Sequence, residues 1–210
     1  MIAVIQTQAM TAEAYLEWEV QQPLKYEYLN GSAYGMTGGT IPNNDIALNL
    51  YRALYPHLRA KGCRVNVADV KVQVLNNGPY FYPDLVVSCD DRDQRARQLI
   101  EHPCLIVEVL SPATEAFDRG EKYRRYRRSP SLQEYVLIDS ETMSVECYRR
   151  SDGRKWELTA YPPEEDATHS DVVEVYFTSI DFRCPLSLIY QDVELLDSAT
   201  VREQDDRVGD

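Results

Sequence analysis

Apolar side chains recur with the period of an amphipathic helix in two segments near the beginning of the chain. Residues 11–21 open with Thr11, a favourable helix-capping residue, and predict a short helix. Residues 43–61 predict the longest helix, which Gly62 ends, because apolar residues recur every four positions at Ile46, Leu50, Leu54 and Leu58. Between the two helices, residues 26–36 contain an Asn-Gly pair that predicts a β-hairpin.

Strand patterns dominate the middle of the chain. Alternating valines at 70–74 predict a strand with one solvated face, and residues 80–88 predict a second strand. Residues 104–110 are apolar at all positions but one, which is typical of a strand buried on both faces. A fourth buried strand is predicted at 135–139. Later strands are predicted at 145–148 and 156–161, and a short closing helix at 186–190.

A helix is also predicted at about 119–128, because Asp118 and Glu121 have the spacing of a capping box. The order of elements predicts an α/β domain around a mixed sheet. We expect the strands around Lys71, Asp84 and Glu108 to be adjacent in one sheet, with helix 43–61 packed on it. We assign residues 10–192 to this domain and predict that the acidic tail, 197–210, is disordered and dispensable for stability.

Composition indicates a globular, soluble protein, since 44% of the 210 residues are hydrophobic and 27% are charged. No apolar run reaches the length of a membrane span, and the first ten residues lack the features of a signal peptide, so we expect a cytoplasmic protein. The 5 cysteines are odd in number, widely spread and without a C-x-x-C motif. That pattern argues against a disulfide framework and a zinc knuckle.

The formal net charge of -12 by itself disfavours a nucleic-acid partner, because phosphate binding favours basic surfaces. The charge is unevenly distributed, however. Much of the acid lies in the tail, and much of the base lies in the run from Arg119 to Arg128. That run is interpreted either as a solvated helix face or as a contact for a phosphate backbone.

Two acids stand out by their surroundings. Glu108 is the only charge in its apolar strand, and Asp84 is the only acid in residues 80–88. An unpaired buried carboxylate is costly, so each must be paired, protonated or bound to a metal. The simpler alternatives are a core Glu satisfied by one cation and an Asp that accepts backbone hydrogen bonds. Together, the two acids predict a Mg²⁺ site with carboxylates roughly 4–6 Å apart.

Lys122 follows Glu108 in the predicted helix. By spacing alone it is one solvated cation among several arginines. The alternative places its ammonium within reach of the carboxylate pair, where it could position water or offset charge on a phosphate.

These residues occur in a pattern that resembles the Uma-two endonuclease family of the PD-(D/E)XK nuclease superfamily. The matching segments are Tyr82-Pro83-Asp84-Leu85-Val86-Val87, Leu105 to Thr114, and Asp118-x-x-x-Lys122-x-x-x-Tyr126, with flanks Lys25 to Gly31 and Pro130 to Leu137. The resemblance covers roughly residues 10 to 192. It implies a restriction-endonuclease-like fold and Mg²⁺-dependent hydrolysis of phosphodiester bonds in nucleic acid, with DNA expected and Mn²⁺ as an alternative cofactor.

Residue by residue, the resemblance implies that Asp84, Glu108 and the Val109 carbonyl hold the metal. The superfamily usually has a lysine two residues after the second acid, where this chain has Leu110. In this family the lysine comes from the following helix, which implies a catalytic role for Lys122. Glu27 matches an early acidic motif and either joins the site or is an exposed hairpin residue.

One departure from the family favours a different function. Many members have a His after the Asn near the start of the long helix, where this chain has Asn44. The rival hypotheses are a catalytically silent binding or scaffold module and a structural Glu108–Lys122 ion pair in a protein that is not a nuclease. A homodimer would suit double-strand cutting, although no residue demonstrates one.

Overall fold

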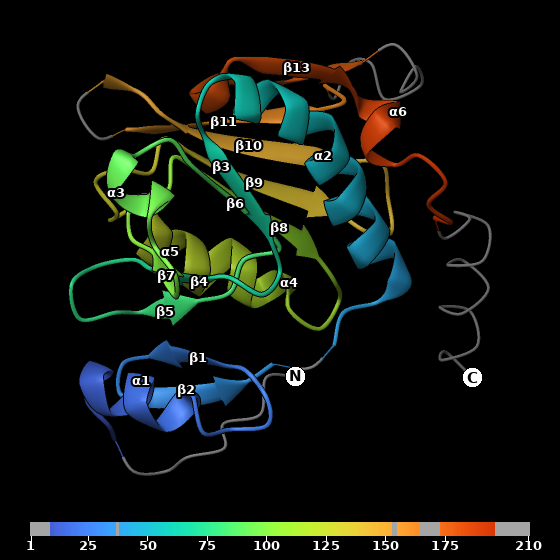
Figure 1. Cartoon of the computed structure of the whole chain (residues 1–210). Helices are drawn as coiled ribbons and strands as arrows, with labels where there is room; N and C mark the ends of the chain where they lie inside the picture. Colours follow the sequence, from blue (N-terminus) through green and yellow to red (C-terminus); the bar gives the residue numbers. More distant parts are fainter. Residues whose placement is uncertain (1–8, 37, 153–154, 164–172, 196–210) are drawn as a thin grey trace, which may run out of the picture.

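The computed structural model describes residues 9–36, 38–152, 155–163 and 173–195, and a six-stranded sheet forms its centre (Figure 1). The spatial order is β11-β10-β9-β8-β6-β3, and β8 and β9 run parallel while the other neighbours run antiparallel. The strands are β3 (Arg64–Val67), β6 (Leu85–Ser88), β8 (Leu105–Leu110), β9 (Glu134–Asp139), β10 (Val145–Arg150) and β11 (Trp156–Tyr161). The tail predicted to be disordered, 197–210, lies outside the described residues.

A smaller, five-stranded sheet contains the predicted hairpin, which is confirmed as β1 (Tyr26–Leu29) and β2 (Ser32–Gly35). Its order is β2-β1-β5-β4-β7, with β4 at Lys71–Gln73, β5 at Tyr80–Phe81 and β7 at Leu99–Ile100. Helix α1 (Ala12–Glu19) is capped by Thr11 as predicted and buries Tyr15 against tyrosines of this sheet. Strands β12 (Glu174–Phe177) and β13 (Phe182–Pro185) form a separate pair.

Helices cover both faces of the six-stranded sheet (Figure 1). On one face, α2 (Ile41–Ala60) and α6 (Leu186–Ile189) pack on the strands, and Ile46, Leu50, Leu54 and Leu58 of α2 are fully buried as their spacing predicts. Each such side chain stabilises the fold by about 1.5–3 kcal/mol. Between the two sheets lie α4 (Glu115–Phe117), the π-helical turn η1 (Asp118–Lys122) and α5 (Tyr123–Tyr126). None of the helices in the described ranges is long and apolar enough to cross a membrane.

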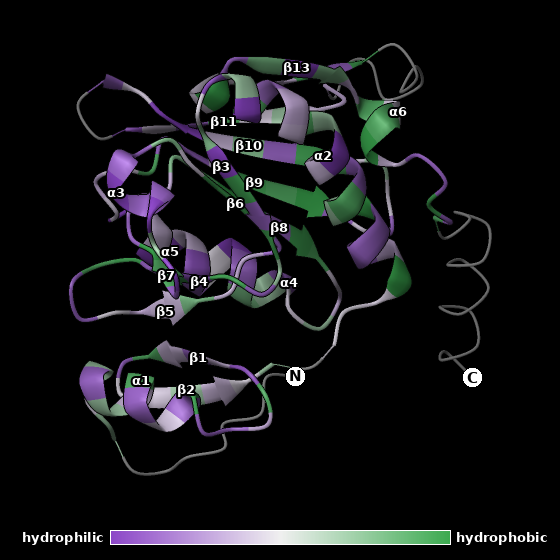
Figure 2. Ribbon diagram, viewed as in Figure 1, coloured by the Kyte–Doolittle hydropathy of each residue, from purple (hydrophilic) through white to green (hydrophobic). Residues whose placement is uncertain are grey.

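Hydropathy follows this layering. Figure 2 shows hydrophobic residues along β6 and β9 in the interior, and hydrophilic residues on α3 (Asp91–Gln94) at the surface. The strand predicted at residues 104–110 is β8, and all of its residues are buried. The continuous apolar pattern around Glu108 therefore does correspond to a strand covered on both faces.

The predicted strand at residues 80–88 is corrected by the structure. It is two short strands, β5 and β6, which belong to different sheets and are separated by residues 82–84. Pro83 lies in this break and has no N–H to donate to a ladder. Consequently β4, which holds Lys71, lies in the smaller sheet, and the prediction that it shares a sheet with Asp84 and Glu108 is wrong. Strands β6 and β8 are adjacent as predicted.

The helix predicted at 119–128 begins earlier, at Glu115, and contains the π-helical turn η1. Asp118 is therefore inside the helical segment and not at its cap, which corrects the capping-box interpretation. Its side chain faces Lys122 instead of the backbone N–H groups of the first turn. Four strands, β3, β7, β12 and β13, were not predicted.

The structure also contains a disulfide bond between Cys63 and Cys89, which the cysteine spacing did not predict. Strands β3 and β6 pair Arg64 with Ser88, so the next residue outward on each strand faces the other across the ladder. Cys104, Cys147 and Cys184 are free thiols.

Candidate active site

Strands β6 and β8 bring Asp84 and Glu108 together. Their register pairs Leu85 with Val107, and one further step places Asp84, immediately before β6, opposite Glu108. Directly opposed residues of antiparallel strands point to one face, with Cβ atoms about 4.5–5.5 Å apart. Both side chains line the same pocket, whose volume is about 760 Å³. The register therefore places both side chains on one face, as the predicted pairing requires, and the separation of roughly 4–6 Å between the carboxylates stays a prediction.

Asp84 is half-buried and accepts one short hydrogen bond. The backbone N–H of Val109 donates to its Oδ2 at 2.7 Å. Burial raises the pKa of Asp84 to about 6, although this hydrogen bond and the nearby Lys122 both act to lower it. With this pKa, the Asp84 carboxyl is mostly ionised at neutral pH and can serve as a ligand for a cation.

Glu108 is 3% exposed and is contacted through one of its two oxygens. The Lys122 ammonium lies 3.2 Å from Oε1, and the Tyr126 hydroxyl lies 3.5 Å from the same atom. Burial raises the pKa of Glu108 well above its ordinary value, with Asp118 and Asp84 adding to the effect and Lys122 opposing it. Among the described residues, Oε2 receives no hydrogen bond, so it is available to a ligand.

Lys122 occupies the centre of a group of acids. Its Nζ lies 3.1 Å from Glu27, 3.2 Å from Glu108 and 3.2 Å from Asp118. Burial lowers the pKa of Lys122, but these carboxylates outweigh burial and raise that pKa well above the ordinary value. The solvated-helix interpretation of Lys122 is therefore wrong, and its ammonium lies within the direct reach of Glu108 that the sequence predicted.

Glu27 projects into the same group from β1 of the smaller sheet. It is 4% exposed, so the alternative of an exposed hairpin residue is wrong. The backbone N–H of Tyr82 donates to its Oε1 at 3.1 Å, which ties β1 to the break between β5 and β6. Burial raises the pKa of Glu27, and Lys122 and this hydrogen bond reduce the effect.

Two residues of the pocket were not singled out as site residues from the sequence. Asp118 is buried beside Lys122, and its spacing of four residues from that lysine on a helix was the signal that could have identified it. Asn43, in the first turn of α2, donates from Nδ2 to the Val109 carbonyl at 2.9 Å. No sequence signal indicates a contact between residues 66 positions apart. The carbonyl oxygen retains a second lone pair for another ligand.

The balance of charge tests whether a divalent cation fits this pocket. When ionised, the four acids carry four negative charges against the one positive charge of Lys122. The described residues contain no three His, Cys, Asp or Glu side chains that converge as a complete metal cage. A cation would therefore be held by two carboxylates, one backbone carbonyl and water, which is how Mg²⁺ is usually held. The four acids in this count are Glu27, Asp84, Glu108 and Asp118. The site fits such an ion in charge and donor type.

The arginines of the basic run do not border the pocket. Arg119 pairs with Glu115 and Glu146, while Arg124 and Arg125 pair with Glu121. None of the described arginines lines the pocket, whose cations are Lys25 and Lys122. The nearby aromatic residues Tyr123 and Tyr126 pack against Tyr135 and are not among the residues that line the pocket.

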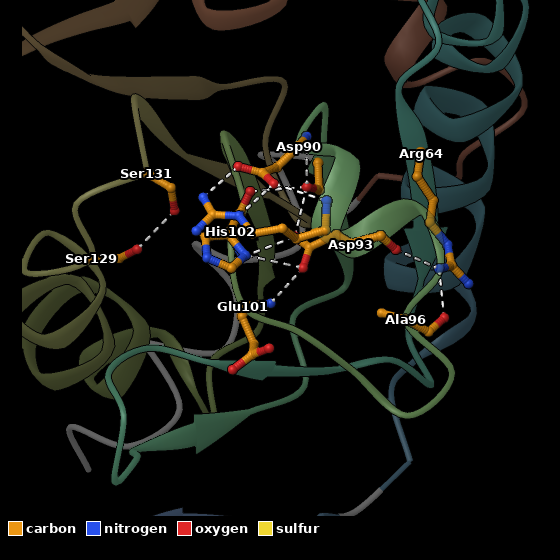
Figure 3. Close-up of polar contacts among 10 residues, drawn as sticks. Arg64, Asp90, Asp93, Ala96, Glu101, His102, Ser129 and Ser131 are labelled. Atoms are coloured by element: carbon orange, nitrogen blue, oxygen red, sulfur yellow. Dashed lines mark hydrogen bonds and ion pairs between the residues drawn. The ribbon is translucent and has the colours of Figure 1, made fainter.

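A second polar cluster, shown in Figure 3, organises the chain around α3 and does not contribute to the pocket. Asp93 is 1% exposed and accepts hydrogen bonds from the Ser88 hydroxyl and from the backbone N–H groups of Glu101 and His102. The His102 ring lies 3.3 Å from the same carboxylate. Because two backbone N–H groups and two side chains of the fold occupy its oxygens, Asp93 is a structural acid.

Comparison with known proteins places these observations in a family. The sequence model of the Uma2 family, described as "Putative restriction endonuclease", matches residues 12–183. Two proteins of Synechocystis sp. (strain ATCC 27184 / PCC 6803 / Kazusa) are similar to the chain. "Uncharacterized protein slr1290" is 40% identical over 72% of this chain and 80% of its own. "Uncharacterized protein sll1609" is 33% identical over 76% of this chain and 91% of its own.

The fold is also similar to a solved structure. A crystal structure from Anabaena variabilis ATCC 29413, described as "a putative nuclease belonging to DUF820", superposes with a TM-score of 0.64. The match covers 86% of this chain and 97% of that chain at 15% sequence identity. At this identity the likeness establishes the mixed α/β fold alone.

Proposed function

The chain belongs to the Uma2 family, and on that premise we propose that it is a Mg²⁺-dependent nuclease that hydrolyses phosphodiester bonds in DNA. The observation that carries the proposal is the pairing of Asp84 with Glu108 across β6 and β8, in a pocket that also holds the buried Lys122. A purely structural ion pair would need one acid for one lysine. Here several acids surround one ammonium, which leaves a deficit of positive charge.

Each residue has a proposed part in the reaction. Asp84 and Glu108, with the Val109 carbonyl, would hold the cation, and the Asn43 amide fixes the direction of that carbonyl. When bound, Mg²⁺ would acidify water and polarise the scissile phosphate. Lys122 would orient the attacking water and offset negative charge that develops on the phosphate. Glu27 helps to keep the ammonium in place from the smaller sheet.

The proposed substrate binds with little help from surface charge. The net charge is -12, and three arginines of the basic run, Arg119, Arg124 and Arg125, are paired with acids of this chain. We therefore expect the cation to supply much of the attraction for the scissile phosphate. Removal of divalent ions should weaken DNA binding as well as abolish cleavage.

The test compares cleavage of plasmid and oligonucleotide DNA in Mg²⁺, in Mn²⁺ and in EDTA. The wild type should cut only with a divalent ion, and Asp84→Asn should lose at least about 100-fold in rate, in line with the loss of one essential charge-stabilising group. The matched control is Asp69→Asn, which removes an acid of the same pocket that is exposed and paired with Lys25. This control should keep nearly full activity.

Two outcomes would contradict the proposal. If the folded wild type binds Mn²⁺ and DNA but cleaves nothing, the chain is a catalytically silent module. If Asp84→Asn and Asp69→Asn cleave equally, the activity comes from another site or from a contaminating nuclease.

A further inference from the structure

Asp118 is the buried acid of the pocket that has the least support from hydrogen bonds. It is 2% exposed, and its Oδ1 receives no hydrogen bond from any described residue. The same oxygen lies 3.2 Å from the Lys122 ammonium. A buried carboxylate without hydrogen bonds is costly, so its attraction to this ammonium must account for its presence.

A second buried lysine in this protein is held by fewer acidic partners than Lys122. Lys71 pairs with the single carboxylate of Glu19 at 2.9 Å, and both side chains are 8% exposed. The Lys71 ammonium also lies 4.9 Å from the centre of the Tyr15 ring, as the Lys122 ammonium lies 5.8 Å from that of Phe81. Lys122 is equally buried but lies within 3.2 Å of three carboxylates. The two additional acids are therefore not required merely to bury an ammonium.

The three partners of Lys122 differ in how they are attached to the fold. Glu27 projects from β1 of the smaller sheet, and Glu108 projects from β8 of the larger sheet. Asp118 lies four residues before Lys122 on the turn η1, so both side chains are attached to the same turn. Asp118 can thus retain the ammonium when Glu108 turns to another ligand.

We propose that Asp118 is a positioning residue, which holds the Lys122 ammonium away from Glu108 when a divalent cation binds the Asp84–Glu108 pair. The proposal rests on the proposed function, because it concerns the same metal site. Without Asp118, the ammonium would depend more on Glu108 and would compete with the incoming cation for that carboxylate. Asp118 therefore acts on the metal through Lys122, and removal of Lys122 should remove most of its influence.

A double-mutant cycle tests this dependence without using catalysis. Calorimetric titration of Mn²⁺ is performed on the wild type, Asp118→Asn, Lys122→Met and the double variant. Asp118→Asn should weaken Mn²⁺ binding at least about 10-fold in the presence of Lys122, within the usual range of coupling between sites. In the Lys122→Met background, the same change should weaken binding less than about 3-fold.

Two further variants distinguish a positioning role of Asp118 from a general effect of negative charge in the pocket and from a loss of folding. Asp69→Asn removes the same charge from the same pocket at an exposed position and should change Mn²⁺ affinity less than about 3-fold. Asp118→Glu keeps the negative charge and should retain affinity within about 3-fold of the wild type, which keeps the test decisive if Asp118→Asn fails to fold.

The outcomes distinguish this inference from the proposed function. A wild type that binds no Mn²⁺ overturns both. A wild type that binds Mn²⁺ while Asp118→Asn has equal effects in both backgrounds, or no effect, overturns the positioning role alone. An Asp118→Glu variant that loses at least about 10-fold in affinity also overturns it, since the charge would then not be what matters.

Discussion

Replacing Lys122 by methionine should destabilise the protein and make its stability depend more strongly on Mg²⁺. Methionine keeps an unbranched chain of similar length but carries no charge. In the wild type, the ammonium offsets the charges of three carboxylates that are each no more than 5% exposed. The variant leaves those acids buried without their cation.

The expected loss follows from the contact distances. At about 3.2 Å and an effective dielectric constant of about 20, each pair has a gross attraction of about 5 kcal/mol. Desolvation of the ammonium and protonation of the acids offset most of that sum. Breaking a buried ion pair by removing one partner costs about 3–5 kcal/mol, and we expect a loss in this range. Since domains are stable by about 5–15 kcal/mol, the variant should still fold.

Mg²⁺ should then restore more stability to the variant than it adds to the wild type. A ligand at 100 times its dissociation constant stabilises the folded state by about 2.7 kcal/mol. In the variant, the cation meets no competing ammonium at Glu108, so its affinity should rise. Urea unfolding followed by circular dichroism measures the free energy of unfolding in EDTA and the increase that Mg²⁺ adds to it.

Lys71→Met is the matched control, because Lys71 is a buried lysine with one acidic partner outside the pocket. It should lose stability in EDTA, but Mg²⁺ should add no more to it than to the wild type. The reasoning is refuted if Lys122→Met is as stable as the wild type in EDTA. It is also refuted if Mg²⁺ stabilises both lysine variants equally.

Three further predictions concern the fold and the edge of the site. Reduction of the Cys63–Cys89 bond, which closes a loop of 26 residues, should lower the free energy of unfolding by about 3.5 kcal/mol, and unchanged urea curves with and without dithiothreitol would contradict it. Asp93→Ala should cost about 3 kcal/mol by leaving buried donors unpaired, with Mn²⁺ affinity unchanged in the same calorimetric titration. Asn43→Ala should cost about 1–2 kcal/mol in urea unfolding, whereas the exposed neighbour change Asn44→Ala should cost less than about 0.5 kcal/mol; equal losses would show that the contact with Val109 is not needed.

The parts of the fold that were predictable are those with long or continuous patterns. Helix α2 follows from apolar residues that recur every four positions from Ile46 to Leu58, and β8 follows from an apolar run that only Glu108 interrupts. A lone acid in such a run must have a partner, which is why the sequence also indicated a cation near Glu108. Burial cost therefore made the centre of the site predictable.

The features that the sequence did not predict depend on contacts between distant segments of the chain. Strand β3 has four residues with only one fully buried, so its pattern is too short to be distinctive. The break at Pro83 places β5 in the smaller sheet, and the pattern of apolar residues does not predict this change of sheet. The Cys63–Cys89 bond and the Asn43 contact depend on register and on packing across the sheet. Such relations become visible only when the strands are in place.

The position of a bound metal tests the central claim most directly. A crystal grown with Mn²⁺ should show an anomalous scattering peak about 2 Å from carboxylate oxygens of Asp84 and Glu108 and from the Val109 carbonyl oxygen. Lys122 should remain beside Asp118 in the same crystal. A well-ordered pocket with no peak at saturating Mn²⁺, or a peak bound by other residues, would contradict the account.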